Sequence, residues 1–187
     1  MSKQKSLGRL FSDLRPDMIL IQETKCCYSQ SLILFSKLKP GWEFCASDAS
    51  GLFGGLLAGW DPHLVCCKDF YSLACIILKA NFKCLSDTFT VINCYGPYTQ
   101  RFTFWNNVVA GGFLGQPNLL LDRGLNFTLS SVEIWGCKAR LDPLASFFSQ
   151  LISCNKLVDL AMNLFGPTWR NGCSGDAGIS KRLDRFL

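Results

Sequence analysis

The chain has 187 residues, of which 49% are hydrophobic and 18% are charged, and its formal net charge is +5. This length and composition suit one globular domain with a sizeable core. The longest apolar candidate, "GLFGGLLAGW", is too short to cross a membrane, and the sequence opens without the apolar core of a signal peptide. We therefore expect an intracellular protein, nuclear or cytoplasmic and not secreted. The mild positive charge permits nucleic-acid contact without arguing for it.

The eleven cysteines and the single histidine, His63, lack the spacing of a metal site. No C-x-x-C pair occurs, whereas structural zinc sites draw paired ligands roughly two to four residues apart. An odd number of cysteines without a secretory signal indicates reduced thiols. Most of them, such as Cys75 and Cys94, are predicted to lie in strand-like runs as small core hydrophobes. His63 stands in the turn "DPHL" and is expected at the surface.

The first half of the chain predicts two helices and several strands. Apolar residues at helical spacing predict a helix over residues 6–14, which Pro16 ends. An apolar strand follows over 18–24 and turns polar at its end. Residues 31–39 fit a helix or a strand, and we favour a helix. Five further strand-like runs, separated by turn signals as in an antiparallel meander, cover residues 42–47, 54–60, 64–72, 74–82 and 89–95.

The second half predicts a helix over 101–112, ended by glycines, and a short strand over 118–121. Residues 122–124, Asp-Arg-Gly, read as a turn. A helix over 142–154 has Asp142 as its N-cap and Pro143 at its first position. The remaining residues form a loop that leads into a strand-like end. This mixture of strands and helices predicts an α/β sandwich with helices packed outside sheets.

Three of the apolar runs end in polar groups that could share a cleft. The first delivers Glu23, the run over 89–95 delivers Asn93 and Tyr95, and the run over 118–121 delivers the stretch 122–126. Functional groups often lie on strand ends and loops that a rigid scaffold holds. Each group alone also has an ordinary explanation, because a Glu after a strand is usually solvated and a Tyr before Gly-Pro often serves packing.

Together, the motifs around these groups resemble a known superfamily. In order they are "PDMILIQETK", "VINCYGPY", "LNFTLSSVEIWG", and "GPTWRNG" with "GISKRLDRFL". They resemble the endonuclease/exonuclease/phosphatase superfamily, the deoxyribonuclease I-like group, and most closely the endonuclease domain of plant LINE-type non-LTR retrotransposons. The resemblance covers nearly the whole chain. It implies a single domain over residues 1–187, folded as a four-layer α/β sandwich.

The resemblance also implies a chemistry and a set of site residues. Members of this superfamily cleave phosphodiesters with Mg²⁺, so DNA is the implied partner and Mg²⁺ the implied cofactor. Glu23 would be the carboxylate ligand of the metal, and Tyr95 would donate a hydrogen bond to the phosphate as charge builds there. In the family motif G-D-x-N, the Asp acts on the attacking water, and the Asn, here Asn126, helps to bind the phosphate region. Asp184 would orient a catalytic histidine of a following S-D-H.

The sequence departs from the family pattern at positions that carry the chemistry. When Asn126 is matched to G-D-x-N, Gly124 occupies the place of the catalytic Asp. Asp122 stands two residues earlier, several ångströms away along a strand, and a misplacement of about 1 Å can cost on the order of a hundredfold in rate. The family's metal-site Asn before the opening helix and its terminal S-D-H are also missing. We therefore expect a copy truncated at both ends, without the terminal strands, whose phosphodiesterase activity is negligible.

Three functions remain open from the sequence. The chain could be a weakly active Mg²⁺-dependent endonuclease that uses Glu23 and Asp122. It could be a non-enzymatic remnant that binds DNA weakly. It could also be another member of the superfamily, acting on inositol phosphates or sphingomyelin, although "GPTWRNG" and "SSVEIWG" favour the retroelement type. Four late basic residues could touch phosphates or form a solvated basic edge: Arg170, Lys181, Arg182 and Arg185. The sequence predicts no protein partner and no membrane contact.

Overall fold

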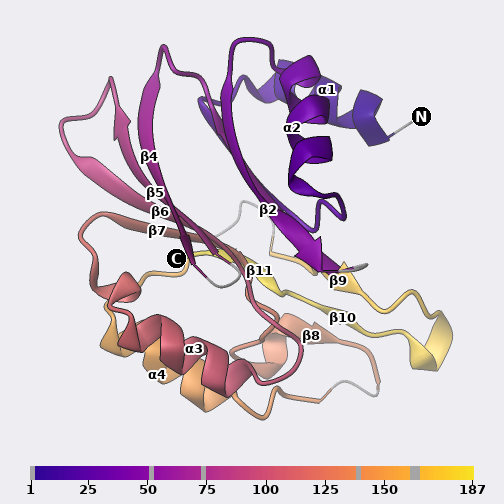
Figure 1. Ribbon diagram of the computed structural model, residues 1–187. Coiled ribbons are helices and arrows are strands. Elements are labelled where there is room, and N and C mark those ends of the chain that lie inside the picture. The colour runs from indigo at the N-terminus through magenta and orange to yellow at the C-terminus, as the bar shows by residue number, and fades with distance from the viewer. Residues whose placement is uncertain (1–2, 51–52, 73–74, 138–139, 161–164) are drawn as a thin grey trace. The chain divides into compact units, whose positions relative to one another are not determined.

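The computed structural model describes residues 3–50, 53–72, 75–137, 140–160 and 165–187. These residues form two compact units, residues 1–93 and residues 94–187, which we call unit 1 and unit 2 (Figure 1). Both units combine helices with antiparallel strands, so the predicted α/β class is confirmed. Within the described ranges, no helix has the length and apolar character needed to span a membrane.

Unit 1 begins with two helices on a three-stranded sheet. The helices are α1 (Lys3–Leu14) and α2 (Tyr28–Leu38), and the strands are β1 (Met18–Gln22), β2 (Glu43–Ser50) and β3 (Phe53–Trp60). The strands are hydrogen-bonded in the order β1-β3-β2, both pairs antiparallel. Both predicted helices are confirmed, including the one over 31–39 that the pattern alone left ambiguous.

The two helices pack on this sheet through a small apolar core. Phe11 of α1 and Phe35 of α2 are buried against Ile19, Ala46 and Leu57, one residue from each strand. Leu57 is fully buried, whereas Phe11 and Phe35 are 6% and 4% exposed. Their burial explains why helices of only three turns form, because short helices draw most of their stability from packing rather than from propensity.

Three further strands are hydrogen-bonded in the order β6-β5-β4. Strands β4 (Val65–Ser72) and β5 (Cys75–Phe82) belong to unit 1, and β6 (Thr88–Tyr95) begins in unit 1 and ends with two residues of unit 2. Asn93 of β6 has no exposed surface. Its Nδ2 donates to the carbonyls of Ile21, at 3.3 Å, and Leu57, at 3.0 Å, and its Oδ1 accepts a hydrogen bond of 3.1 Å from Gln22. Asn93 therefore satisfies backbone groups in the core of unit 1 and does not reach an open cleft, contrary to the prediction.

The described residues of unit 2 form two helices, three short 3-10 turns and short strands. The helices are α3 (Arg101–Ala110) and α4 (Ala145–Cys154); the 3-10 turns are Phe113–Gly115, Ser131–Glu133 and Gly175–Ala177; the strands are β7 (Leu119–Gly124), β8 (Ile134–Trp135), β9 (Trp169–Arg170), β10 (Ser180–Lys181) and β11 (Asp184–Phe186). Strand β7 pairs with β11, and β10 lies between β8 and β9.

An aromatic cluster forms the core of unit 2, where α3 and α4 lie side by side (Figure 1). Phe127 and Phe148 are stacked with ring centroids 3.7 Å apart and an interplanar angle of 11°. The indole of Trp105 meets both rings edge-on, at 6.1 Å and 6.2 Å. All three side chains are at most 1% exposed.

Residues 122–124 are strand, so the predicted turn at this place is wrong. Strand β7 continues to Gly124, with Asp122 opposite Phe186 and Gly124 opposite Asp184. Leu121 and Leu187 also exchange two backbone hydrogen bonds, at 2.8 Å and 3.0 Å. The partner β11 supplies these hydrogen bonds, and they hold an Asp-Arg-Gly sequence extended where its local preference favours a turn.

The cysteines are free thiols, but most of them do not lie in the core. Cys45, Cys75 and Cys94 are buried, whereas the other eight, all within the described ranges, are exposed or half-buried. Six of the eleven lie in loops or turns or at a helix end: Cys26, Cys27, Cys84, Cys137, Cys154 and Cys173. In β4, Cys66 is exposed and Cys67 is half-buried. The prediction that most are small core hydrophobes therefore holds for the three buried cysteines alone.

Candidate functional site

Four of the predicted site residues lie close together in unit 2. Gly96, directly after Tyr95, donates its N–H to the carbonyl of Gly124 at 2.9 Å. Gly124 is in turn the register partner of Asp184, and the side-chain amide of Asn126 donates to the carbonyl of Gly96. The ends of β6, β7 and β11 thus meet at one place, as the sequence predicted for the first two.

Asn126 has an unusual backbone conformation, with a φ of 55°. Few non-glycine residues adopt this left-handed region, although Asn tolerates it better than most. The conformation is held from two sides, because Arg101 donates to the Asn126 carbonyl at 2.9 Å and the Asn126 amide is bonded to Gly96. Strained residues of this kind persist only where the surroundings fix them, and they are often found at functional sites.

Gly96 is required for this close approach. A Cβ at this position would lie 2.6 Å from the carbonyl oxygen of Leu125. The backbone of Leu125 cannot yield as a flexible side chain could, so only glycine lets the two segments meet. This contact explains the Gly of "YGP" and brings Tyr95 beside the stretch that carries Asn126.

Tyr95 is half-buried and is in contact with a second tyrosine. Its hydroxyl donates to that of Tyr98 at 3.1 Å, and the two rings meet edge-on with centroids 6.2 Å apart. Tyr98 is 56% exposed. Tyr98 lines the same pocket as Asn126, and the Tyr95 phenol is in contact with Tyr98.

Glu23 lies in unit 1, directly after β1, and the structure describes it there. It is exposed, and its φ of 51° is again left-handed. The next two residues are hydrogen-bonded to β3, since the backbone N–H groups of Thr24 and Lys25 donate to the carbonyls of Gly55 and Gly54 at 3.2 Å and 3.3 Å.

The single histidine, His63, is exposed in unit 1, as predicted, and its backbone N–H donates to the Asp61 carboxylate at 2.9 Å.

Asp122 does not occupy the place of Gly124. Both residues belong to β7, where residues two apart face the same side but are separated by roughly 7 Å. Asp122 is also only 6% exposed. Its carboxylate is therefore largely closed to a substrate.

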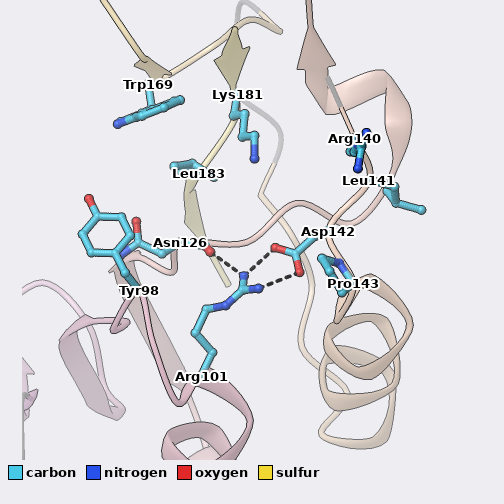
Figure 2. A pocket seen from close by; sticks show the side chains of 10 residues that line it. All are labelled: Tyr98, Arg101, Asn126, Arg140, Leu141, Asp142, Pro143, Trp169, Lys181 and Leu183. Carbon is cyan, nitrogen blue, oxygen red and sulfur yellow. Dashed lines mark hydrogen bonds and ion pairs between the residues drawn. The ribbon is translucent and has the colours of Figure 1, made fainter. Parts of the chain in front are cut away.

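A pocket of 440 Å³ opens beside Asn126 in unit 2 (Figure 2). Ten residues line it: Tyr98, Arg101, Asn126, Arg140, Leu141, Asp142, Pro143, Trp169, Lys181 and Leu183. Arg101 and Asp142 form a bidentate ion pair at its base, at 2.5 Å and 2.9 Å. Asp142 also accepts from the N–H of Leu144 at 2.9 Å. The predicted N-cap is therefore wrong: α4 begins at Ala145 with Leu144 as its N-cap, and Asp142 holds the turn that precedes the helix.

Arg182 and Arg185 are buried, which contradicts their predicted place at a phosphate-binding or solvated basic edge. They are 5% and 1% exposed. Each guanidinium contacts both Glu133 and Asp159, with ion-pair distances between 2.6 Å and 2.9 Å. We call these four residues the buried ion ring. Two carboxylates cancel two guanidinium charges there, so the ring adds no net charge to the surface.

Glu133 and Arg182 of this ring have shifted pKa values. Burial opposes ionisation of Glu133, but hydrogen bonds from Arg185, from the Leu129 N–H and from Arg182 outweigh it and hold the pKa of the Glu133 carboxyl below its ordinary value. Hydrogen bonds to Asp159 raise the pKa of Arg182 against the opposing effect of burial.

Stability is expected to fall at acid pH because of Glu133. Its pKa is lower in the folded state, so its contribution is fully present above the unfolded pKa of about 4.3 and is lost as the pH falls through the folded value. Urea unfolding at a series of pH values below and above about 4.3 measures this loss of stability. A Glu133→Gln variant should show a flatter pH dependence, and equal slopes in the two proteins would contradict the prediction.

The sequence did not predict the ion pairs of two carboxylates in unit 2, those of Asp142 and Glu133. Asp142 was predicted only as an N-cap, and its ion-pair partner Arg101 lies 41 residues away. Glu133 lies 49 and 52 residues from its two arginines. The available signal was the low content of charged residues, because isolated charges in apolar stretches such as "VEIWG" are often buried in pairs.

Solved structures with the same fold are known. The endonuclease domain of TRAS1, a telomere-specific non-LTR retrotransposon, matches with a TM-score of 0.68 at 14% identity, over 98% of this chain and 77% of that one. An AP endonuclease from Leishmania major matches with a TM-score of 0.69 at 13% identity, over 98% and 73%. A mannosyl-6-phosphatase from Bacteroides thetaiotaomicron matches with a TM-score of 0.62 at 12% identity, over 98% and 75%.

These likenesses show that the chain has the deoxyribonuclease I-like α/β fold of endonuclease/exonuclease/phosphatase proteins, as the sequence predicted. No protein-family model and no curated protein sequence matches the chain. At identities between 12% and 14%, the neighbours establish the fold and leave the activity to be argued from the residues.

Proposed function

We propose that the chain is a degenerate copy of a Mg²⁺-dependent retrotransposon DNA endonuclease, formed as one domain, in which phosphodiester hydrolysis is negligible. Two of its structural neighbours are an endonuclease domain of a non-LTR retrotransposon and an AP endonuclease, which supports phosphodiester chemistry for the fold. The observation that carries the proposal is Gly124, which stands where the family's catalytic Asp belongs, with Asp122 buried two residues away.

The remaining residues would keep part of the phosphate-binding function. Asn126 donates its amide to the carbonyl of Gly96, the residue after Tyr95, and Asp184 lies opposite Gly124. A carboxylate at position 124 would act on the attacking water, and glycine has no side chain to do this. When one member of a site that acts as a unit is lost, most of the rate is lost with it.

Mg²⁺ is compatible with this donor set only as a weakly held ion. Among the described residues, no group of three or more His, Cys, Asp and Glu side chains could hold a metal ion. Glu23 offers an exposed carboxylate, and Mg²⁺ is commonly held by one or two carboxylates together with water and substrate phosphate. When bound, the ion would stabilise charge on the phosphate and on the leaving oxygen.

A plasmid-nicking assay tests the proposal. With Mg²⁺, the purified chain is expected to leave supercoiled plasmid intact at enzyme concentrations far above those at which deoxyribonuclease I nicks it completely. A Glu23→Ala variant should be indistinguishable from the unaltered chain, and Gly124→Asp should restore little, since one group of a cooperative site recovers little rate alone.

The contrary result is equally clear. Nicking by the purified chain that disappears with Glu23→Ala would mean that the site still works and that the loss of the Asp at position 124 is compensated. Nicking that persists in Glu23→Ala identifies a contaminating nuclease and is removed by further purification before the comparison is repeated.

A second candidate is nucleic-acid binding without hydrolysis. It is favoured by the pocket beside Asn126, which combines the basic side chains of Arg140 and Lys181 with the indole of Trp169, 37% exposed. Basic groups beside an exposed aromatic ring suit a single strand, whose bases stack and whose phosphates are attracted. The affinity of the chain for a single-stranded oligonucleotide, compared with that of a Lys181→Gln variant, tests this candidate.

A further inference from the structure

Arg101 is placed to control the conformation of Asn126. It opens α3, and one of its terminal nitrogens donates to the Asn126 carbonyl at 2.9 Å and also to the Asp142 carboxylate at 2.5 Å (Figure 2). The other terminal nitrogen donates to the second oxygen of Asp142 at 2.9 Å. The guanidinium therefore lies between one carboxylate and one strained backbone carbonyl.

The geometry requires a guanidinium. Its planar fork fits both oxygens of a carboxylate and still has N–H groups left for a carbonyl, whereas a lysine ammonium is a point charge without this fixed geometry. The pair is also shielded from solvent, with side-chain exposures of 18% for Arg101 and 8% for Asp142. In partial burial such a pair is less screened than at the surface, so it keeps its orientation.

Asp142 is itself anchored to α4. Its carboxylate accepts from the N–H of Leu144 at 2.9 Å, and its backbone carbonyl accepts from Ala145 at 3.0 Å. Asn126, Arg101 and Asp142 thus form a chain of contacts that joins the end of β7 to the start of both helices. In this chain Arg101 is neutralised, so it does not serve as a free cation for phosphate.

We infer that Arg101, oriented by Asp142, is a positioning residue that holds Asn126 in its left-handed conformation and so aims the Asn126 amide. The inference rests on the proposed function where it concerns nucleic acid, because Asn126 is the residue proposed to contact the phosphate region. Its structural part stands on the contacts within unit 2 and can be measured without any ligand.

The experiment follows the Asn126 side-chain amide by NMR in the full chain, with its signals assigned through an Asn126→Asp variant. In the unaltered protein the two amide protons should be well separated, because one is bonded to the Gly96 carbonyl. In Arg101→Gln this separation should collapse towards that of a solvent-exposed amide. Arg101→Lys should give an intermediate result. Asp142→Asn should resemble Arg101→Gln while still accepting from the Leu144 N–H, because the Asn side-chain oxygen is also an acceptor.

Matched controls separate positioning from general destabilisation. Arg170→Gln removes an exposed arginine of the same unit that does not line the pocket, and it should leave the Asn126 signals unchanged. Lys181→Gln removes a cation that lines the pocket but is not part of the contacts among Asn126, Arg101 and Asp142. It should also leave the Asn126 signals unchanged. Unchanged Asn126 signals in folded Asp142→Asn and Arg101→Gln would overturn the inference; if Arg101→Gln does not fold, Asp142→Asn decides it.

A titration with a fluorescent single-stranded oligonucleotide supplies the functional readout. Arg101→Gln should weaken binding by about tenfold, as expected for an indirect loss of one well-oriented contact, with little change in salt dependence. Lys181→Gln should weaken binding and also reduce the salt dependence, because it removes a charge. If the unaltered chain binds no oligonucleotide, the nucleic-acid part of the proposed function is wrong, and the NMR comparison still decides whether Arg101 positions Asn126.

Discussion

Replacing Arg185 with leucine is expected to lower the free energy of unfolding by about 3–5 kcal/mol, the usual cost of breaking a buried ion pair by removing one partner. The Arg185 side chain is fully buried and donates to Glu133 and Asp159, both at 2.6 Å. Without it, Glu133 keeps its charge in a buried place and loses one of its two guanidinium partners. The loss comes mainly from this uncompensated carboxylate, because the leucine itself suits an apolar position.

Urea denaturation measures this loss, and a double variant identifies its cause. If the buried carboxylate is responsible, Arg185→Leu combined with Glu133→Leu should cost clearly less than the sum of the two single changes, because contacting groups are not additive. The exposed arginine of β9 provides the control, since Arg170→Leu should change stability by no more than about 0.5 kcal/mol. Additive single effects, or a loss in Arg185→Leu no larger than in the control, would contradict a stabilising ring.

Phe148→Ala is expected to cost a similar amount, about 3–5 kcal/mol, because it removes a large aromatic side chain from a closed core. Phe148 has no exposed surface and stacks on Phe127 with centroids 3.7 Å apart. The indole of Trp105 approaches its ring edge-on at 6.2 Å. The cavity left by the ring would therefore be bordered by rigid aromatic side chains, which relax poorly into empty space.

Phe102→Ala in α3 is the matched comparison for this change. Phe102 also meets an aromatic ring, that of Phe147 at 4.8 Å, but it is 52% exposed. It should therefore cost about 1 kcal/mol or less, since surface substitutions away from special contacts have small effects. Equal losses in the two variants, measured as the midpoint and slope of urea unfolding, would show that the aromatic cluster is not the core of unit 2.

The elements that could be predicted from the sequence are those whose pattern is local. Helices α1, α2 and α3 and the strands of unit 1 follow from the spacing of apolar residues over a few turns or pairs. The turn predicted at residues 122–124 is wrong because the conformation of this stretch depends on pairing with β11, about sixty residues further along the chain. A rule based on neighbouring residues cannot include so distant a partner.

The candidate site was predictable only in part, and for a related reason. Glu23, Tyr95, Asn126 and Asp184 were named through resemblance to a family, and in unit 2 three of them do meet at strand ends. Arg182 and Arg185 were misplaced because basic residues near the end of a chain usually face water. Their carboxylate partners are 23 to 52 residues away, so only the folded chain reveals the pairs.

The buried ion ring shows that residues of a family motif can serve the fold and not the chemistry. Glu133 belongs to "SSVEIWG", and Arg182 and Arg185 belong to "KRLDRFL", two of the stretches that carry the family resemblance. In this protein those residues bind one another in the interior, and they keep that role whether or not a phosphodiester is ever cleaved. For Glu133, Arg182 and Arg185, resemblance in these stretches therefore reports how the chain folds and carries no evidence about catalysis.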